Sequence, residues 1–219
     1  MRLSTYTELQ EAVADWLNRV GSPEVAARTP DFVRLFEAKF DHYDPPIRHP
    51  KMTVRATAAA DSEYIRLPGD FLEMQRVRFV QGRRGTLRYV TPEEFEDEKK
   101  RAVGGDYSGI FTVVGEEMQV YPFTAEAGVQ VELTYWGKLP KLDALASETP
   151  AQPNNWLLRD YPSAYLYGAL LEAAPYLRDD ERITVWAAGL SQAMDFLIAA
   201  GDRARHSAGT LKPRRRKLG

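Results

Sequence analysis

The sequence has no cysteine and only three histidines among its 219 residues. Without cysteine, no disulfide can form and no thiolate can act as a nucleophile or a metal ligand. The histidines, His42, His49 and His206, stand in unrelated contexts. None has a metal-type partner three or four residues away on a well-marked helix. We therefore expect structural or solvated histidines, and neither a bound metal nor another cofactor.

Long uninterrupted apolar runs are also missing. Charged and polar residues break up the first twenty positions, so we expect no secretory leader. The other apolar runs are shorter than the roughly 20 residues that a bilayer requires. Hydrophobic residues still make up 44% of the chain, enough for a globular core. These features predict a soluble protein made in a cytoplasm, with no membrane partner.

Motifs that would carry catalysis are absent. The segment "VGGDYSG" from Val103 to Gly109 is rich in glycine, but no Lys-Ser or Lys-Thr pair follows it. No Gly-x-Ser-x-Gly element occurs, and Ser108 has no evident histidine partner. The clustered acids of "EEFEDEKK" from Glu93 to Lys100 are typical of a solvated helix face with local Glu–Lys pairs. We therefore do not expect an enzyme.

Charge is distributed unevenly along the chain. The segment from 207 to 219 carries five positive charges and no acid: Lys212, Arg214, Arg215, Arg216 and Lys217. Without them the formal net charge falls from −2 to −7, so the remainder is acidic. Such a tail cannot form a packed core. It is either a solubilising end or a docking segment that becomes ordered on an acidic partner or on phosphates.

Two helices are predicted in the first 46 residues. Thr5 and Glu8 have the spacing of a capping box, and apolar residues follow at helical spacing. For the second helix, Thr29 suits the N-cap and Pro30 the first helical position. Asp44-Pro45-Pro46 ends it. We interpret residues 1–46 as an N-terminal helical hairpin.

The middle of the chain, residues 47–140, has the pattern of an antiparallel β domain. Its strand candidates are short, rich in β-branched or aromatic residues, and separated by turn signals. They are residues 52–60, 63–67, 71–80, 86–90, 110–115, 117–123 and 129–136. One short helix, with Thr91 and Glu94 at capping-box spacing, interrupts them.

A connector and a C-terminal helical hairpin are predicted for residues 141–206. Pro162 suits the start of one helix, and an apolar stripe of Leu166, Leu170 and Ala173 marks its inner face. The stripe of the next helix comprises Ile183, Trp186, Ala187, Leu190, Met194, Leu197 and Ile198. The expected fold class is α+β: two helical hairpins packed as a bundle, with a central antiparallel β domain inserted between them.

The chain resembles the phage adaptor proteins, which connect head and tail in short-tailed phages and related gene-transfer particles. The main resemblance is "NNWLLRDYPSAYLYGALLEAAPYLRDDERITVWAAGL" from Asn154 to Leu190. The segment "LPGDF" at Leu67 to Phe71 and the segment "LTYWGKLPKL" at Leu133 to Leu142 agree with it. The similarity extends over nearly the whole chain and is weakest between Gly82 and Gly128 and in the basic tail.

This resemblance implies a structural role in a virion. Such adaptors form a ring of twelve copies beneath the portal protein, carry the tail nozzle or hub, and leave a channel through which double-stranded DNA passes. It places the protein in the neck of the virion, assembled in the bacterial host cytoplasm. We expect the five tail cations to dock on the portal. We expect contacts between subunits from Tyr165, Tyr167, Asp179, Asp180, Glu181 and Trp186.

Two other functions remain open from the sequence. One is a stopper or tail-completion protein of the neck, which would differ from an adaptor only in its partner. The other is a DNA-binding packaging protein that uses the basic tail. The latter predicts an affinity for DNA that depends strongly on salt, and the acidic remainder of the chain argues against it.

Overall fold

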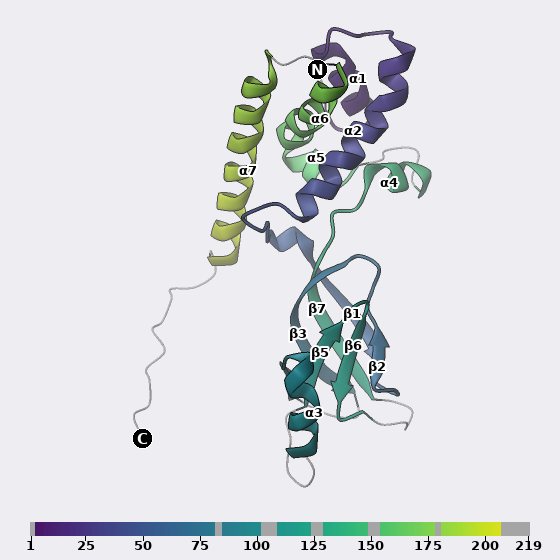
Figure 1. Cartoon of the computed structure of the whole chain (residues 1–219), viewed down its shortest axis with the longest axis vertical. Coiled ribbons are helices and arrows are strands. Elements are labelled where there is room, and N and C mark those ends of the chain that lie inside the picture. The colour runs from purple at the N-terminus through teal and green to yellow at the C-terminus, as the bar shows by residue number, and fades with distance from the viewer. Residues whose placement is uncertain are drawn as a thin grey trace. The chain divides into compact units, whose positions relative to one another are not determined.

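The computed structural model describes residues 3–81, 85–101, 109–123, 129–148, 154–177 and 181–206. The chain divides into two compact units (Figure 1). The helical unit comprises Met1–Lys51 and Leu139–Gly219, and the β unit comprises Met52–Lys138. The expected combination of helices with a β sheet is confirmed.

The helical unit contains six of the α-helices of the described residues. They are α1 (Tyr6–Trp16), α2 (Pro23–Asp41), α4 (Leu142–Glu148), α5 (Trp156–Asp160), α6 (Pro162–Leu177) and α7 (Ile183–His206). The predicted capping box of α1 is present: the Thr5 hydroxyl accepts from the Glu8 amide at 3.2 Å, and a Glu8 carboxylate oxygen accepts from the Thr5 amide at 3.2 Å. The sequence therefore sets the start of α1 locally.

The start of α2 differs from the prediction. The helix begins at Pro23 with Ser22 as its N-cap, and Thr29 and Pro30 lie inside it. The Thr29 hydroxyl donates to the Val25 carbonyl at 2.8 Å instead of capping. Ser22-Pro23 and Thr29-Pro30 offer the same chemistry, a hydroxyl cap followed by proline. The earlier pair starts the helix, and the later proline costs it one internal hydrogen bond.

Helix α6 forms the centre of the helical unit and packs against α1, α2, α5 and α7. In Figure 1 it lies between α2 and α7. Gly168 allows α2 to come close, because a Cβ at this position would collide with the ring of Phe36. Leu170 and Ala169 are fully buried. The apolar stripe predicted for this helix therefore faces the core of the unit.

The β unit is one sheet of seven strands in the order β1-β7-β3-β4-β5-β6-β2. The strands are β1 (Thr53–Ala59), β2 (Tyr64–Arg66), β3 (Phe71–Gln81), β4 (Gly85–Tyr89), β5 (Ile110–Val114), β6 (Glu117–Tyr121) and β7 (Gln130–Gly137), and a 3-10 turn, Pro50–Met52, precedes β1. All seven predicted strands are present. The sheet is not wholly antiparallel, because β4 and β5 pair in parallel. Helix α3 (Pro92–Arg101) connects these two strands, and this crossover permits the parallel pair.

Side chains from all seven strands meet in one core, so the sheet curls around it. Val77 of β3, Phe111 of β5 and Leu133 of β7 are among its buried members. Alternate residues of each strand therefore point outward. On the outside of the sheet, Phe95 of α3 packs with Ile110 and Val90 in a second, smaller cluster.

Candidate functional site

A buried network of polar groups in the helical unit joins two of the residues that carry the family resemblance. The Tyr165 hydroxyl on α6 donates to a Glu37 carboxylate oxygen on α2 at 2.9 Å and accepts from the Asn155 amide nitrogen at 2.6 Å. The same Asn155 amide is 2.7 Å from the Pro140 carbonyl, while its oxygen caps α5 at the Leu158 amide. The network holds α2, α6, the N-terminus of α5 and the connector in one arrangement.

Glu37 is the member of this network that the sequence analysis missed. Its side chain is only 1% exposed, and the Oε1 atom also accepts from the Leu142 amide at 3.0 Å. Burial raises the pKa of the Glu37 carboxyl, outweighing the hydrogen bonds from Leu142 and Tyr165 that lower it. A glutamate between Phe36 and Phe40 in the apolar stripe of α2 was the available signal.

The residues proposed for contacts between subunits occupy different environments. Tyr165 is fully buried, and Trp186 is 3% exposed with the Arg182 guanidinium 5.1 Å from its ring. Both side chains therefore pack inside the helical unit of the single chain. Tyr167 is half-buried and packs edge-on against Trp16 at 5.8 Å, whereas Glu181 is exposed.

The other proposed site residues lie outside the described residues. These are Asp179 and Asp180, and all five cations of the tail: Lys212, Arg214, Arg215, Arg216 and Lys217. Most of the glycine-rich segment, including Ser108, also lies outside them. The hypotheses about these residues therefore stay predictions.

His49 has a structural environment. Its ring stacks on Trp156 at 5.0 Å with an interplanar angle of 11°, and Tyr161 packs edge-on at 5.9 Å. The Nδ1 atom accepts from the Lys51 amide at 3.2 Å, and burial lowers the pKa of the imidazole. Within the described ranges, no group of three or more His, Asp or Glu side chains could hold a metal ion.

Helix α7 has a long exposed side that is almost free of charge. Trp186, Met194 and Leu197 are buried on its inner side. We define the outer face of α7 by its exposed residues between Thr184 and Ala199: Thr184, Val185, Ala187, Ala188, Ser191, Gln192, Asp195, Phe196 and Ala199. Val185 and Phe196 are 64% and 62% exposed and lie eleven residues apart, about three helical turns. An apolar face of this length is typical of an interaction surface.

The same helix departs from the expectation that no segment is long enough for a bilayer. By length and composition alone, Ile183–Arg205 could span a membrane, and only 17% of its most apolar part is buried. The sequence predicts a core stripe for the apolar residues of this helix, and the polar residues between them interrupt every long apolar run. One helix of this kind is weak evidence for a membrane protein, since helices of soluble proteins meet the same criterion.

The "LPGDF" segment forms the turn that leads into β3. The Phe71 amide donates to the Pro68 carbonyl at 3.0 Å, and the Tyr135 hydroxyl donates to the Asp70 carboxylate at 2.8 Å. The Lys138 amide donates to the Asp70 carbonyl at 2.7 Å. Burial, followed by the hydrogen bond to Asp70 and the Asp70 charge, raises the pKa of Tyr135. The motif therefore holds the start of β3 against the end of β7.

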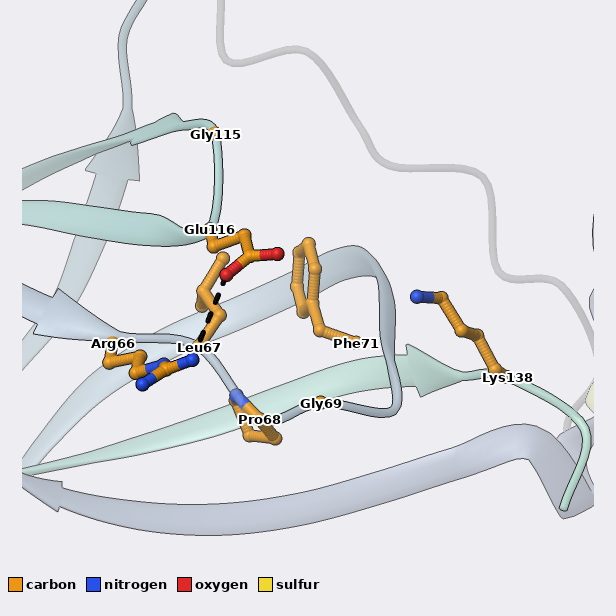
Figure 2. A pocket seen from close by; sticks show the side chains of 8 residues that line it. All are labelled: Arg66, Leu67, Pro68, Gly69, Phe71, Gly115, Glu116 and Lys138. Atoms are coloured by element: carbon orange, nitrogen blue, oxygen red, sulfur yellow. Dashed lines mark ion pairs between the residues drawn. The ribbon is translucent and has the colours of Figure 1, made fainter.

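An open pocket of about 430 Å³ lies beside this turn, and Figure 2 shows the residues that line it. Its charged groups are Arg66, Glu116 and Lys138. Arg66 and Glu116 form an ion pair at 3.8 Å, but their side chains are 82% and 88% exposed. Both side chains are therefore largely solvated and are not held in a fixed arrangement. The pocket therefore gives no indication of catalysis.

The comparison with known families agrees with the motifs. Residues 4–214 match the family described as SU10 adaptor protein. No curated protein matches the chain. The match includes the buried Tyr165–Asn155 network, the turn at Leu67–Phe71 and the whole of α7. The chain therefore belongs to the SU10 adaptor protein family.

Proposed function

We propose that the chain is the structural adaptor of a phage neck. It forms a ring that docks beneath the portal protein, carries the tail nozzle and leaves a channel for DNA. The observation that carries this proposal is the family match over residues 4–214. The described part of the chain agrees with a structural role, because its buried polar groups hold helices and turns together.

The outer face of α7 is the surface that we assign to the neighbouring subunit. Val185 and Phe196 are too exposed to stabilise the single chain by burial, yet they follow one side of the helix. The residues between them are mainly small, so a second backbone can approach closely. Asp195 is the one charge on this face and is not sufficient to repel a second copy. A repeated contact of this type closes into a ring when its rotation permits.

The remaining proposed sites complete this arrangement. Glu181, together with Asp179 and Asp180, lies just before α7 in the sequence and adds acids at one end of the same contact. We assign the five cations of the tail to the portal. A channel must let DNA slide, and the acidic remainder of the chain, at −7 without the tail, suits a wall that does not bind phosphates.

The test is assembly with the portal. The purified chain, alone and mixed with portal rings of its phage, is analysed by sedimentation and by negative-stain imaging. We expect a closed ring of subunits on the portal. A variant that lacks residues 212–219 should keep its circular dichroism and solubility but lose portal docking. The matched control replaces the same residues with a Gly-Ser segment of equal length.

Three results would contradict the proposal in different ways. If the chain stays a single particle in the presence of the portal, the adaptor function is wrong. If docking survives the deletion, only the role of the tail is wrong. If the chain binds duplex DNA tightly, with an affinity that falls steeply as salt rises, a packaging function replaces the adaptor function.

A further inference from the structure

The outward side of the β unit carries two arginines in one row across three strands. Thr134 on the central strand β7 pairs with Arg55 on β1 and with Arg76 on β3. We call Arg55, Thr134 and Arg76 the arginine row. Both arginines are exposed, and neither forms an ion pair with any residue that the structure describes. Their charges are therefore available to an anionic partner.

Thr134 indicates that this row is incomplete in the isolated chain. Its side chain is 7% exposed, and its hydroxyl has no hydrogen-bond partner among the described residues. A buried hydroxyl without a partner is unfavourable. An acceptor brought between the two arginines would provide the missing hydrogen bond.

The acid beside Thr134 on β7 is held by a different arginine. Glu132 lies two residues from Thr134 on β7, but both its oxygens are held by Arg78, at 2.8 Å from Nε and 3.0 Å from Nη2. The hydrogen bond from Arg78, and then the charges of Arg78, Arg55 and Arg76, hold the pKa of Glu132 below its usual range. Glu132 stays ionised and paired with Arg78, which leaves two positive charges beside it.

The complementary surface lies on α3 of the same unit. Glu93, Glu96 and Asp97 are exposed and share one side of the helix, since they are three and four residues apart. We call them the acidic face of α3. A shallow groove along the helix is lined by Glu93, Glu94, Asp97, Glu98 and Arg101, four carboxylates with one guanidinium. Asp97 already pairs with Lys100 at 3.3 Å and Glu98 with Arg88 at 2.7 Å, so Glu93 and Glu96 are the acids that we assign to incoming arginine side chains.

The two surfaces lie on different sides of the curled sheet. The arginine row is centred on β7, whereas α3 packs on the outside of β5 through Phe95 and Ile110. In the strand order, β3 and β4 lie between β7 and β5. Around the other side of the curled sheet, the edge strands β1 and β2 and then β6 lie between them. Opposite charges on opposite sides of one body are the arrangement that a head-to-tail contact requires.

We propose that the arginine row of one subunit docks on the acidic face of α3 of the next subunit. This inference rests on the ring of the proposed function and adds a second, electrostatic contact to it. The contact fixes the direction of assembly, because two arginine rows or two acidic faces repel each other. Duplex DNA is a less suitable occupant, since a unit with two free arginines on one side and an acidic helix on another offers few phosphate contacts.

The experiment reverses each surface in the full chain and then reverses both. The variants are R55E/R76E, E93R/E96R and the combination of all four changes. The control R19E/R66E makes the same change in net charge at two exposed arginines outside the row. Ring formation, alone and on the portal, is measured by sedimentation and negative stain at two salt concentrations. Circular dichroism establishes that each variant is folded.

We expect R55E/R76E and E93R/E96R each to weaken assembly by about tenfold or more, and the variant with all four changes to restore it. The control should assemble like the wild type.

If the reversed variants form rings normally, this contact is wrong while the adaptor function stands. If the combined variant stays defective, the two surfaces are not partners. If the wild type forms no ring even on the portal, the adaptor function itself fails. Loss of duplex-DNA binding in R55E/R76E with normal rings would assign the row to DNA.

Discussion

Helices α6 and α7 follow each other in the chain and are both rich in apolar residues, but they use these residues differently. Helix α6 is surrounded by α1, α2, α5 and α7, and its residues from Ala164 to Leu166 and from Gly168 to Leu170 are all buried. Helix α7 packs mainly on α6 and leaves its other side exposed. One helix therefore builds the core of the helical unit, and the other leaves two large apolar side chains exposed.

The comparison shows what apolar content alone can decide. Periodicity identifies an apolar stripe, and in both helices its large residues face the unit: Leu170 in α6, and Met194 and Leu197 in α7. Ala187, which was predicted in the stripe of α7, is exposed. It does not say whether the opposite side is covered. In α7 that side consists largely of alanine, serine and glutamine, which are compatible with solvent, with a second helix or with both. Val185 and Phe196 are the residues that distinguish an interaction surface from an ordinary solvated face.

The largest effect should come from truncation within α6. Leu170→Ala removes a fully buried side chain and should lower the free energy of unfolding by about 2–5 kcal/mol, because the packed helices around it cannot collapse into the cavity. Urea unfolding followed by tryptophan fluorescence measures this effect. Trp16, Trp156 and Trp186 lie in the helical unit and Trp136 lies in the β unit, so three of the four tryptophans report on the helical unit.

The matched control for this variant is Leu35→Ala on α2. Leu35 is 50% exposed, so the same truncation should change the free energy of unfolding by well under about 1 kcal/mol. Equal losses for the two variants would mean that α6 is not the core of the unit. The comparison between α6 and α7 would then lose its basis.

A smaller effect, which depends on pH, should come from Glu37, which hydrogen-bonds to α6. Its pKa is raised in the folded chain, whereas in the unfolded chain it ionises near its ordinary value of 4.5. The wild type should therefore lose stability as the pH rises from about 4.5 through the folded pKa, by about 1.4 kcal/mol for each unit of the shift. The Glu37→Gln side chain stays neutral at every pH, so the variant does not lose this stability. The difference in free energy of unfolding between variant and wild type should therefore grow in favour of the variant across this window and stay constant above it.

Unfolding curves for both proteins across the pH range provide the measurement. Other acids, such as Glu132 and Glu63 with lowered pKa values, oppose this trend as the pH falls, but they contribute equally to the wild type and the variant. Asp143→Asn is a useful companion variant. The Asp143 charge raises the pKa of Glu37, so its removal should move the window to lower pH. A difference between wild type and Glu37→Gln that does not vary with pH would show that Glu37 has an ordinary pKa.

The sequence was sufficient for features that depend on local chemistry. The capping box of Thr5 and Glu8 and the seven strands were predicted correctly, because each is signalled within a few residues. The start of α2 was placed wrongly, since Thr29-Pro30 and Ser22-Pro23 give the same local signal. The parallel pairing of β4 with β5 depends on how α3 crosses the sheet, and neither strand carries a signal for it.

The candidate site was less predictable for a similar reason. Tyr165 and Trp186 were expected at a contact between subunits, because a sequence shows that aromatic residues share a helix but not which of them find partners inside the chain. Tyr165 has two hydrogen-bond partners. Glu37 lies 128 residues away in the sequence, and Asn155 lies 10 residues away, beyond one helical turn. Exposure of the outer face of α7 likewise depends on which other helices pack against α7, and the sequence does not show this.

The smallest effect on stability, and the most informative one, should come from the outer face of α7. Val185→Ser combined with Phe196→Ser changes two side chains that are more than half exposed, so the free energy of unfolding should stay within about 0.5 kcal/mol for each change. Assembly on the portal should nevertheless weaken, because the apolar area that the proposed contact removes from water is lost.

Val20→Ser with Leu35→Ser is the matched control, since these residues are 74% and 50% exposed elsewhere in the helical unit. Equal loss of assembly in the control would show that general surface polarity, and not this face, controls the contact. Flotation of the wild type with lipid vesicles, abolished in the α7 variant while assembly is unchanged, would assign the face to a membrane instead.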